Sequence, residues 1–316
     1  MLIPLKIDIT MTNISKIKEN KSTKELLEFG IINIDKPSNP TSFDVSDFVR
    51  KKLGLRKTSH FGTLDPKVTG VLPIALNRAC KLTGFFLGED KEYVGIMRVH
   101  EEISIEEIEK AIKENFIGIV KQTPPVKSRV KRQEREREIK KFEILEKDGN
   151  DFLFRAEVQG GTYIRKLIDD LGKHIGIGAH MLELRRVRAG IFNEDDKNYP
   201  SVNLYELEKA VVEYKKGNDE KLREIIIPAE IVGEVYPSTE VKEDCLKNLF
   251  TGKHFFKDYL KKPEKFEKGE VICVFSTERF IGMYKVINEE EIFAKAEFVL
   301  QEIKRGDTPT HSPRGK

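Results

Sequence analysis

One stretch of the sequence places a carboxylate in a short loop ahead of an apolar segment. Residues 59–82 read SHFGTLDPKVTGVLPIALNRACKL, and Asp65 lies inside the loop. Gly62, Pro66 and Gly70 are typical of a tight turn that leads into a strand. Pro66 disfavours the helical conformation for Asp65, so its carboxylate can project into a cleft. Taken alone, an Asp-Pro pair is more often a simple turn whose carboxylate binds backbone amides.

A carboxylate on such a loop can act as a nucleophile and divide a difficult reaction into two easier steps. The group must be ionised at neutral pH, whereas burial would raise its pKa. An arginine would offset this effect and aim the carboxylate through its planar fork. Arg165 is the candidate, because it lies in the first turn of a predicted helix, where a cation is unfavourable without an acidic partner.

The elements that position the loop can be read from local patterns. Residues 30–35, GIINID, predict a short buried strand. Thr41 and Asp44 have the spacing of a capping box at the start of a helix. Gly54 can end that helix in the left-handed conformation. Asn39 lies in the turn between strand and helix, where it tolerates a positive φ.

The remaining pattern alternates strands and helices. Tyr93 lies on a predicted strand at 92–99, where an aromatic residue usually packs in a core or at an edge. Beside a carboxylate and an extruded base it can instead stack on the base. We predict a short helix at about 180–184 and a helical connector at 195–235. The other predicted elements are helices near 105–112, 161–171 and 204–214, and strands near 152–158, 271–275 and 281–286.

Several segments, in order along the chain, resemble the motifs of the TruB/dyskerin family of pseudouridine synthases. The archaeal dyskerin type, the catalytic subunit of box H/ACA guide-RNA particles, is the most similar form, and the resemblance covers roughly residues 28–300. Asn39 departs from the family pattern, which has glycine there. The segments that carry the resemblance are Lys36-Pro37 with Pro40-Thr41-Ser42, Gly62-Thr63-Leu64-Asp65-Pro66, Lys91-Glu92-Tyr93, and Gly161-Thr162-Tyr163-Ile164-Arg165 with Leu184-Arg185-Arg186.

The resemblance implies an isomerase that converts specific uridines of rRNA, and of tRNA as a further candidate, to pseudouridine without a cofactor. Asp65 would be the catalytic carboxylate, with Tyr93 and Arg165 as its catalytic partners. Attack at C1′ and elimination to a glycal both remain open as mechanisms. The residues expected to contact the substrate are Lys36, His60 and Leu184, and Lys36 could alternatively stabilise the active-site loop. Without the resemblance, an exposed lysine and a structural histidine would be the simpler interpretations.

The implied fold is α/β (α+β), with a mixed, mostly antiparallel central sheet, flanking helices and a small β-barrel-like PUA domain. Leu249-Phe250-Thr251-Gly252-Lys253 resembles the glycine-centred loop of a PUA domain, although Lys253 replaces a small residue. Met11 is an alternative translation start. The expected parts are an N-terminal arm at 1–27 that could pack on the PUA domain, a catalytic domain at 28–234 with the helical connector near its end, a PUA RNA-binding domain at 235–304, and a disordered tail at 305–316.

Net charge is only +3, so the distribution of charge carries the evidence for RNA binding. Basic residues outnumber acidic ones in 127–141, and Arg185, Arg186 and Arg188 form a second cluster. The alternative for the first run is a solvated face with internal salt bridges. The candidates for RNA contact are Lys127, Arg129, Lys131, Arg132, Arg185, Arg186, Gly252 and Lys253.

The length of the segment after Pro124 bears on how the RNA is selected. Bacterial-type members of the family carry a long insertion there that holds a tRNA stem-loop, and this chain has no room for it. The resemblance therefore implies a box H/ACA guide RNA, a paired substrate RNA and small protein subunits as partners. Two alternatives are a stand-alone tRNA uridine-55 pseudouridine synthase and a non-catalytic RNA-binding scaffold.

The amino-acid composition argues against a membrane protein, a disulfide-rich protein and a metalloprotein. With 34% charged residues and no apolar run long enough to span a bilayer, we expect a soluble, cytoplasmic protein without a membrane partner. Cys80, Cys245 and Cys273 are odd in number and widely spaced, and no C-x-x-C pair occurs. We therefore expect neither a disulfide framework nor a metal site.

Overall fold

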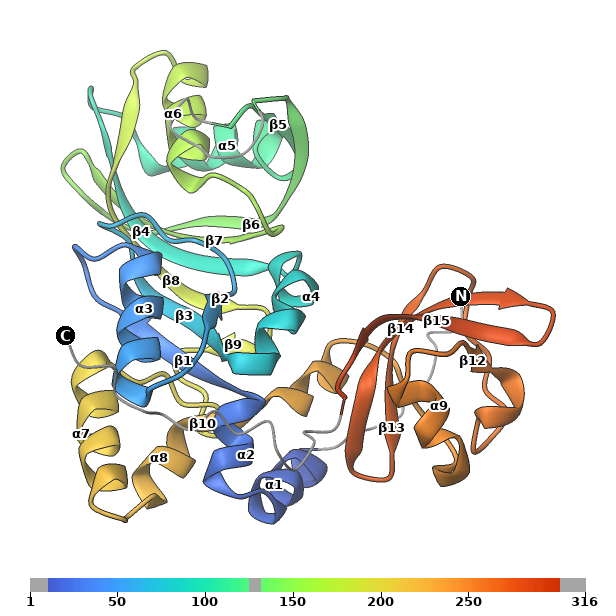
Figure 1. Cartoon of the computed structure of the whole chain (residues 1–316). Coiled ribbons are helices and arrows are strands. Elements are labelled where there is room, and N and C mark those ends of the chain that lie inside the picture. Colours follow the sequence, from blue (N-terminus) through green and yellow to red (C-terminus); the bar gives the residue numbers. More distant parts are fainter. Residues whose placement is uncertain (1–10, 125–131, 302–316) are drawn as a thin grey trace. The chain divides into compact units, whose positions relative to one another are not determined.

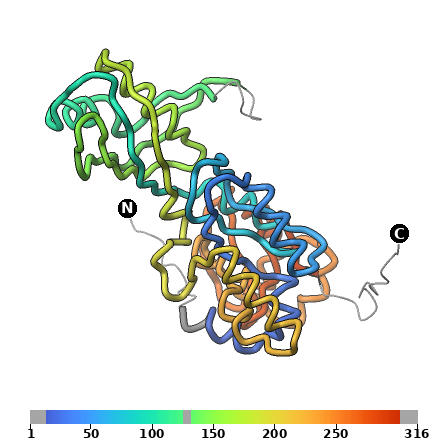
Figure 2. The backbone as a smooth tube through the Cα atoms, turned by 90° about the vertical axis from the view of Figure 1, so that its left-hand side faces the viewer, coloured from blue at the N-terminus to red at the C-terminus, as the bar shows by residue number. Residues whose placement is uncertain are grey.

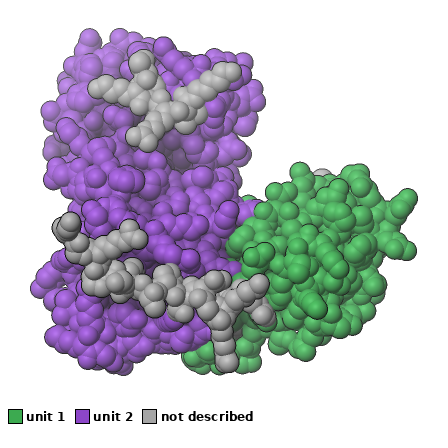
Figure 3. Space-filling view, viewed as in Figure 1, with its two compact units in different colours: residues 1–20, 230–316 green, residues 21–229 purple. Residues whose placement is uncertain are grey.

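The computed structural model describes residues 11–124 and 132–301 (Figure 1). The chain divides into two compact units, which are coloured separately in Figure 3. Unit 1 comprises residues 1–20 and 230–316, and unit 2 comprises residues 21–229. Asp65, Tyr93 and Arg165 all belong to unit 2.

Unit 2 is built on one large sheet with helices packed against it. Its strands are β1 (Gly30–Lys36), β2 (Thr58–His60), β3 (Thr69–Leu76), β4 (Lys91–Val99), β5 (Gly118–Gln122), β6 (Arg135–Asp148), β7 (Asp151–Val158), β8 (Ala179–Ala189), β9 (Phe192–Asn193) and β10 (Ile226–Pro228). Its helices are α2 (Thr23–Glu28), α3 (Ser42–Leu53), the 3₁₀ helix η1 (Asn77–Leu82), α4 (Thr83–Leu87), α5 (Ile105–Asn115), α6 (Ile164–His174), α7 (Leu204–Lys215) and α8 (Glu220–Ile225).

The described strands of unit 2 form one sheet in the order β10-β1-β3-β8-β4-β7-β6-β5, with β2 beside β3 and β9 beside β8. Strands β3 and β8 run parallel, and the other neighbouring pairs run antiparallel. Helices α5 and α6 pack at the end of the sheet that contains β5–β7, whereas α3 and α7 pack at the end that contains β1 (Figure 2). The predicted mixed, mostly antiparallel sheet with flanking helices is confirmed.

Local sequence signals explain how the helix that supports the loop begins and ends. The Thr41 side chain accepts a hydrogen bond from the Asp44 amide, and the Asp44 carboxylate caps the Thr41 amide in return. Gly54 ends α3 at φ 64°, in the left-handed region. Asn39 has φ 92°, so it adopts the positive φ that the family's glycine would adopt. The capping box and both turn conformations were predicted correctly.

One prediction of secondary structure was wrong. The segment 180–184 was predicted to be helical, but it lies inside strand β8. Most of its residues are good helix formers, yet β8 is hydrogen-bonded to β4 along its length and to β3 near Arg186. Tertiary pairing therefore overrides local propensity. The connector also contains strand β10, which extends the sheet next to β1.

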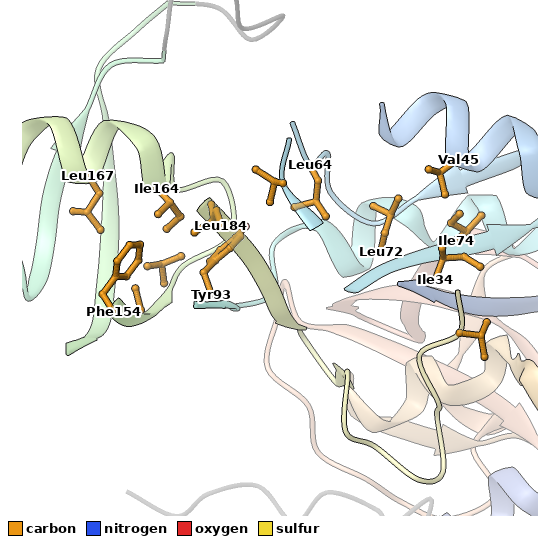
Figure 4. Packing of buried hydrophobic residues seen from close by; sticks show 14 of the residues in the cluster. Ile34, Val45, Leu64, Leu72, Ile74, Tyr93, Phe154, Ile164, Leu167 and Leu184 are labelled. Carbon is orange, nitrogen blue, oxygen red and sulfur yellow. The ribbon is translucent and has the colours of Figure 1, made fainter. Parts of the chain in front are cut away.

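The hydrophobic core of unit 2 extends to the loop that carries Asp65. Leu64, the residue before Asp65, is 3% exposed and belongs to the main core cluster. Figure 4 shows Tyr93 and Leu184 between Leu64 on one side and Ile164 and Phe154 on the other. The side chains next to the candidate site are therefore anchored in the core rather than in mobile surface loops.

Unit 1 combines helix α1 (Met11–Asn20) with the C-terminal part of the chain. Lys16 Nζ lies 2.5 Å from a Glu278 carboxylate oxygen, and Asn20 Nδ2 donates to the other oxygen at 3.0 Å. Its other elements are η2 (Ala229–Glu234), β11 (Ser238–Glu240), η3 (Glu243–Cys245), α9 (Leu246–Phe250), β12 (Phe255–Phe256), η4 (Lys257–Tyr259), β13 (Val271–Ser276), β14 (Arg279–Glu289) and β15 (Ile292–Val299).

The described strands of unit 1 form a five-stranded sheet in the order β11-β13-β14-β15-β12. The sheet curls around a core of its own that includes Phe255, Tyr284 and Phe293 (Figure 1). This arrangement is consistent with the small β-barrel-like domain expected from the sequence. None of the described helices of either unit combines the length and apolar character needed to cross a membrane.

Candidate active site

The backbone of the loop that carries Asp65 is held on both sides of that residue. On one side, the Leu64 amide donates to Ser42 Oγ at 2.8 Å, and the same hydroxyl donates to the Leu64 carbonyl at 3.0 Å. On the other side, the Asn39 amide donates to the Pro66 carbonyl at 2.9 Å. The turn before α3 and the start of α3 thus fix the position of Asp65 without touching its carboxylate.

Of the two roles considered for Lys36, the structure supports stabilisation of the active-site loop rather than contact with the substrate. Lys36 is fully buried. Its Nζ donates to three backbone carbonyls, those of Pro37 at 2.8 Å, Pro66 at 2.9 Å and Val68 at 2.8 Å. Burial lowers the pKa of this ammonium group, while the charge of Asp65 acts in the opposite direction. Because its three donors are already used, Lys36 supports the Asp65 loop from inside the protein.

Asp65 and Arg165 meet although they come from distant parts of the chain. Arg165 Nη2 lies 2.6 Å from Asp65 Oδ2. The two side chains are 61% and 48% exposed, so the pair stands at the surface of unit 2 with part of its hydration intact. The acidic partner expected for a cation in the first turn of α6 is therefore Asp65 itself.

A residue that the sequence analysis missed holds the start of α6. Gln122, 3% exposed at the end of β5, donates from Nε2 to the Tyr163 carbonyl at 3.3 Å. Its Oε1 accepts from the Tyr163 amide at 3.0 Å. Tyr163 is the N-cap of α6, two positions before Arg165. Gln122 therefore acts on Arg165 through the backbone, and its place two positions before Pro124-Pro125 was the signal that the sequence offered.

Tyr93 and Leu184 lie on neighbouring strands, β4 and β8, at the centre of the sheet. Each residue is 8% exposed. Leu184 is the cross-strand partner of Gly95, where a Cβ atom would lie only 2.8 Å from Leu184 Cδ1. The absence of a side chain at residue 95 therefore leaves the space that Leu184 occupies beside Tyr93 (Figure 4).

His60 ends strand β2, five positions before Asp65. Its Nδ1 is buried and has no hydrogen-bond partner among the described residues. Burial is the main cause that lowers the pKa of the imidazole, and the positive charge of Arg186 lowers it further. The ring is thus neutral at neutral pH and can present a polar atom to a ligand.

Arg186 was predicted to bind RNA, and this prediction is wrong. The residue is 1% exposed, and its guanidinium lies inside the protein rather than at the surface. Arg185 is half-exposed, but its Nη1 lies 2.9 Å from Asp35 Oδ1 and its Nε lies 2.7 Å from Glu194 Oε2. With two carboxylate partners, Arg185 offers RNA no net positive charge. The spacing of this arginine cluster could not reveal which members face inward.

The remaining candidates for RNA contact are less defined. Lys127, Arg129 and Lys131 lie outside the described residues. Arg132 is exposed ahead of β6, where Lys140 pairs with Asp90. In unit 1, Gly252 has φ 78° just after α9, and exposed Lys253 donates to Asn248 Oδ1 at 3.3 Å. Among the described residues no group of three or more His, Cys, Asp or Glu side chains is placed to hold a metal ion.

Two family descriptions match consecutive parts of the chain. Residues 50–164 match the TruB family pseudouridylate synthase N-terminal domain, and residues 165–232 match the tRNA pseudouridylate synthase B C-terminal domain. A probable tRNA pseudouridine synthase B of Methanopyrus kandleri is 41% identical over 260 residues, which cover 82% of this chain and 75% of that protein. Its counterpart in Archaeoglobus fulgidus is 39% identical over 286 residues, which cover 89% of this chain and 86% of that protein.

Solved structures similar to this chain extend over both units. A Cbf5-Nop10-Gar1 complex contains a chain with a TM-score of 0.82 and 35% identity, covering 89% of this chain and 88% of that one. An H/ACA RNP bound to a substrate RNA containing 2′-deoxyuridine contains a chain with a TM-score of 0.81 and 33% identity, covering 90% and 89%.

Proposed function

The chain belongs to the TruB family of pseudouridine synthases, and on that premise we propose that it isomerises uridines in an RNA that a guide RNA selects. The isomerase activity is that of the family. The observation that carries the assignment of the active site is the ion pair between Asp65 and Arg165 at 2.6 Å, on a loop whose backbone is fixed on both sides.

In the proposed reaction Asp65 initiates cleavage of the C1′–N1 bond of uridine. The carboxylate either attacks C1′ directly or assists elimination to a glycal, and the detached uracil carries the bonding electrons. The base then turns so that C5 bonds to C1′. In the first route this bond displaces the Asp65 carboxylate from C1′, and in the second route the proton that Asp65 took from C2′ returns to C2′. The proton on C5 leaves, and N1 gains a proton. Atoms and electrons balance within the nucleotide, so the chain's own task is to aim one carboxylate and hold one base.

The side chains around Asp65 have types suited to holding that base. The uridine must leave its stack, at a cost of a few kcal/mol. Tyr93 supplies an aromatic face and a hydroxyl, and Leu184 supplies an apolar neighbour on the adjacent strand. We assign Tyr93 to stacking on the base and to proton transfer at C5, and His60 to a polar contact made in its neutral form.

Two observations support selection of the substrate by a guide RNA. Strand β5 ends at Gln122 and β6 begins at Arg135, so residues 123–134 are all that the chain has where an RNA-holding insertion would lie. Two of the similar solved structures are an H/ACA RNP bound to a substrate RNA and a box H/ACA sRNP Nop10-Cbf5 complex. On this basis unit 1 would anchor the guide RNA, and small proteins comparable to Nop10 and Gar1 would complete the particle.

The second candidate is a stand-alone enzyme that modifies a tRNA. It is favoured by the names of the relatives, several of which are called probable tRNA pseudouridine synthase B. Both candidates use the same chemistry at Asp65, so they differ only in how the uridine reaches it.

Tritium release from RNA labelled at C5 of uridine distinguishes the candidates, because the C5 hydrogen is lost only when the new glycosidic bond forms. The full chain is assayed on a tRNA T-arm and on a guide-paired target, each with and without an H/ACA guide RNA and the small proteins. Release only with guide and proteins is the expected result. Release of tritium from the T-arm by the chain alone would favour the stand-alone enzyme over the guided one. Tight RNA binding without any release of tritium would overturn both candidate functions.

A further inference from the structure

Arg186 lies on the central strand β8, between β3, which follows the Asp65 loop, and β4, which carries Tyr93. On one side of β8 its backbone pairs with Gly70 of β3, and on the other side its cross-strand partner is Tyr93 of β4. Gly70 has φ 100°, and a Cβ atom there would lie 2.2 Å from the Arg186 carbonyl oxygen. The strands can approach this closely only because residue 70 has no side chain.

The guanidinium of Arg186 reaches from β8 to the start of the Asp65 loop. Its Nε donates to the Val71 carbonyl at 2.8 Å, and its Nη2 donates to the Gly62 carbonyl at 3.2 Å. Gly62 precedes Asp65 by three positions in the loop. The planar fork of arginine thus joins strand β3 to the loop segment that leads into Asp65.

Tyr93 is the remaining neighbour of this guanidinium. Tyr93 is the cross-strand partner of Arg186, so the two side chains lie next to each other on one face of the sheet. Within the described part of the chain no carboxylate forms an ion pair with Arg186, although the residue is 1% exposed. A buried cation without an acidic partner is costly, so this group is more than a filler of the core.

The charge of Arg186 is also felt by groups on β2 and β4. It contributes to the lowered pKa of His60, for which burial is the larger cause. It is the second cause, after burial, that lowers the pKa of Lys91 to about 8. Arg186 therefore influences His60, Tyr93 and the Gly62 carbonyl from one buried position.

We propose that Arg186 is a positioning residue for isomerisation, which fixes Tyr93 relative to the loop that carries Asp65. This inference rests on the proposed roles of Asp65 and Tyr93 and adds the residue that sets their relative placement. The arginine does not touch the substrate. It keeps Tyr93 and the carboxylate in register while a base enters between them.

The test is a double-mutant cycle measured by single-turnover tritium release from whichever RNA the wild-type chain modifies. Arg186→Gln is expected to lower the rate by about 100-fold, the scale of an ångström-sized misplacement, with RNA affinity unchanged within about threefold. Because Arg186 acts through Tyr93, the double variant with Tyr93→Phe should match Tyr93→Phe alone rather than show the product of both losses. Additive losses would overturn the proposal.

Two further variants separate geometry from charge and from general damage. Arg186→Lys keeps the charge but loses the fork, so its rate should stay low while the pKa of His60, followed by NMR, stays near that of the wild type. Arg186→Gln should raise the pKa of His60 toward its ordinary value of about 6.5. Arg98→Gln, an exposed arginine on β4 that pairs with Asp151, is the matched control and should retain full activity.

The outcomes are decisive for the proposal itself. The proposal would be overturned if folded Arg186→Gln reacted at the wild-type rate. It would also be overturned if Arg186→Lys restored the full rate while Arg186→Gln left the pKa of His60 unchanged. Loss of folding in both Arg186 variants, seen by thermal unfolding, would make the residue a stability element and would also overturn it. Absence of activity in the wild type would instead count against the proposed function, since the NMR arm reports on Arg186 independently.

Discussion

Asp65 Oδ2 and Arg165 Nη2 lie 2.6 Å apart at the surface of unit 2. Asp65 comes from the loop between β2 and β3, and Arg165 comes from the first turn of α6. Each partner is about half exposed, so the pair contributes little to folding stability. Stability therefore does not account for the pair, and in the proposed function the arginine aims the carboxylate.

Replacing Asp65 tests the catalytic role directly. Asp65→Ala and Asp65→Asn should each lower tritium release by at least about 10³-fold, the scale seen when a catalytic nucleophile is removed. RNA affinity and thermal unfolding should stay near wild type, because the loop is held through its backbone and through Leu64 rather than through the carboxylate. A parallel loss of RNA binding and stability would show that Asp65 is structural.

Replacing Arg165 separates aiming from stability. Arg165→Ala should lower the single-turnover rate by about 100-fold while the free energy of unfolding changes by less than about 1 kcal/mol. Arg165→Lys should recover only part of the rate, because an ammonium group lacks the planar, directional geometry of the guanidinium. Equal losses of stability and activity would contradict the role given to this pair.

Gln122 gives a prediction at a residue far from Asp65 in sequence. Gln122→Ala removes both part-buried hydrogen bonds to the Tyr163 backbone, which should cost about 1–3 kcal/mol of stability. Activity should fall with it, measured where the variant is still folded, since α6 no longer holds Arg165 in place. Gln159→Ala, which loses one exposed hydrogen bond to the Glu138 amide, is the control and should change neither quantity appreciably.

Lys91 predicts a pH dependence of stability. The residue is 4% exposed, and its pKa is lowered by burial from 10.5 to about 8. Between these two values the unfolded chain binds the proton and the folded chain does not, so raising the pH favours the folded state. The wild type should therefore gain up to about 3 kcal/mol between pH 8 and 10.5, relative to Lys91→Met, in denaturant unfolding. Parallel stability curves for the two proteins would contradict the lowered pKa.

The sequence by itself determined the elements whose signals are local. The capping box at Thr41 and Asp44, the left-handed Gly54 and the strand of Tyr93 depend on residues a few positions apart. These elements follow from backbone stereochemistry and short-range hydrogen bonding, which the nearest neighbours decide. Asp65 was found differently, through the order of the motifs that resemble the family, since an Asp-Pro pair alone indicates a simple turn.

Only the tertiary structure decided which polar side chains face inward. Lys36 and Arg186 look like surface cations in the sequence, yet both are buried and donate to backbone carbonyls around the Asp65 loop. Segment 180–184 became part of a strand because β4 and β3 pair with β8 on either side. Burial and pairing depend on residues far apart along the chain, so no local pattern of charge or helix propensity could predict them.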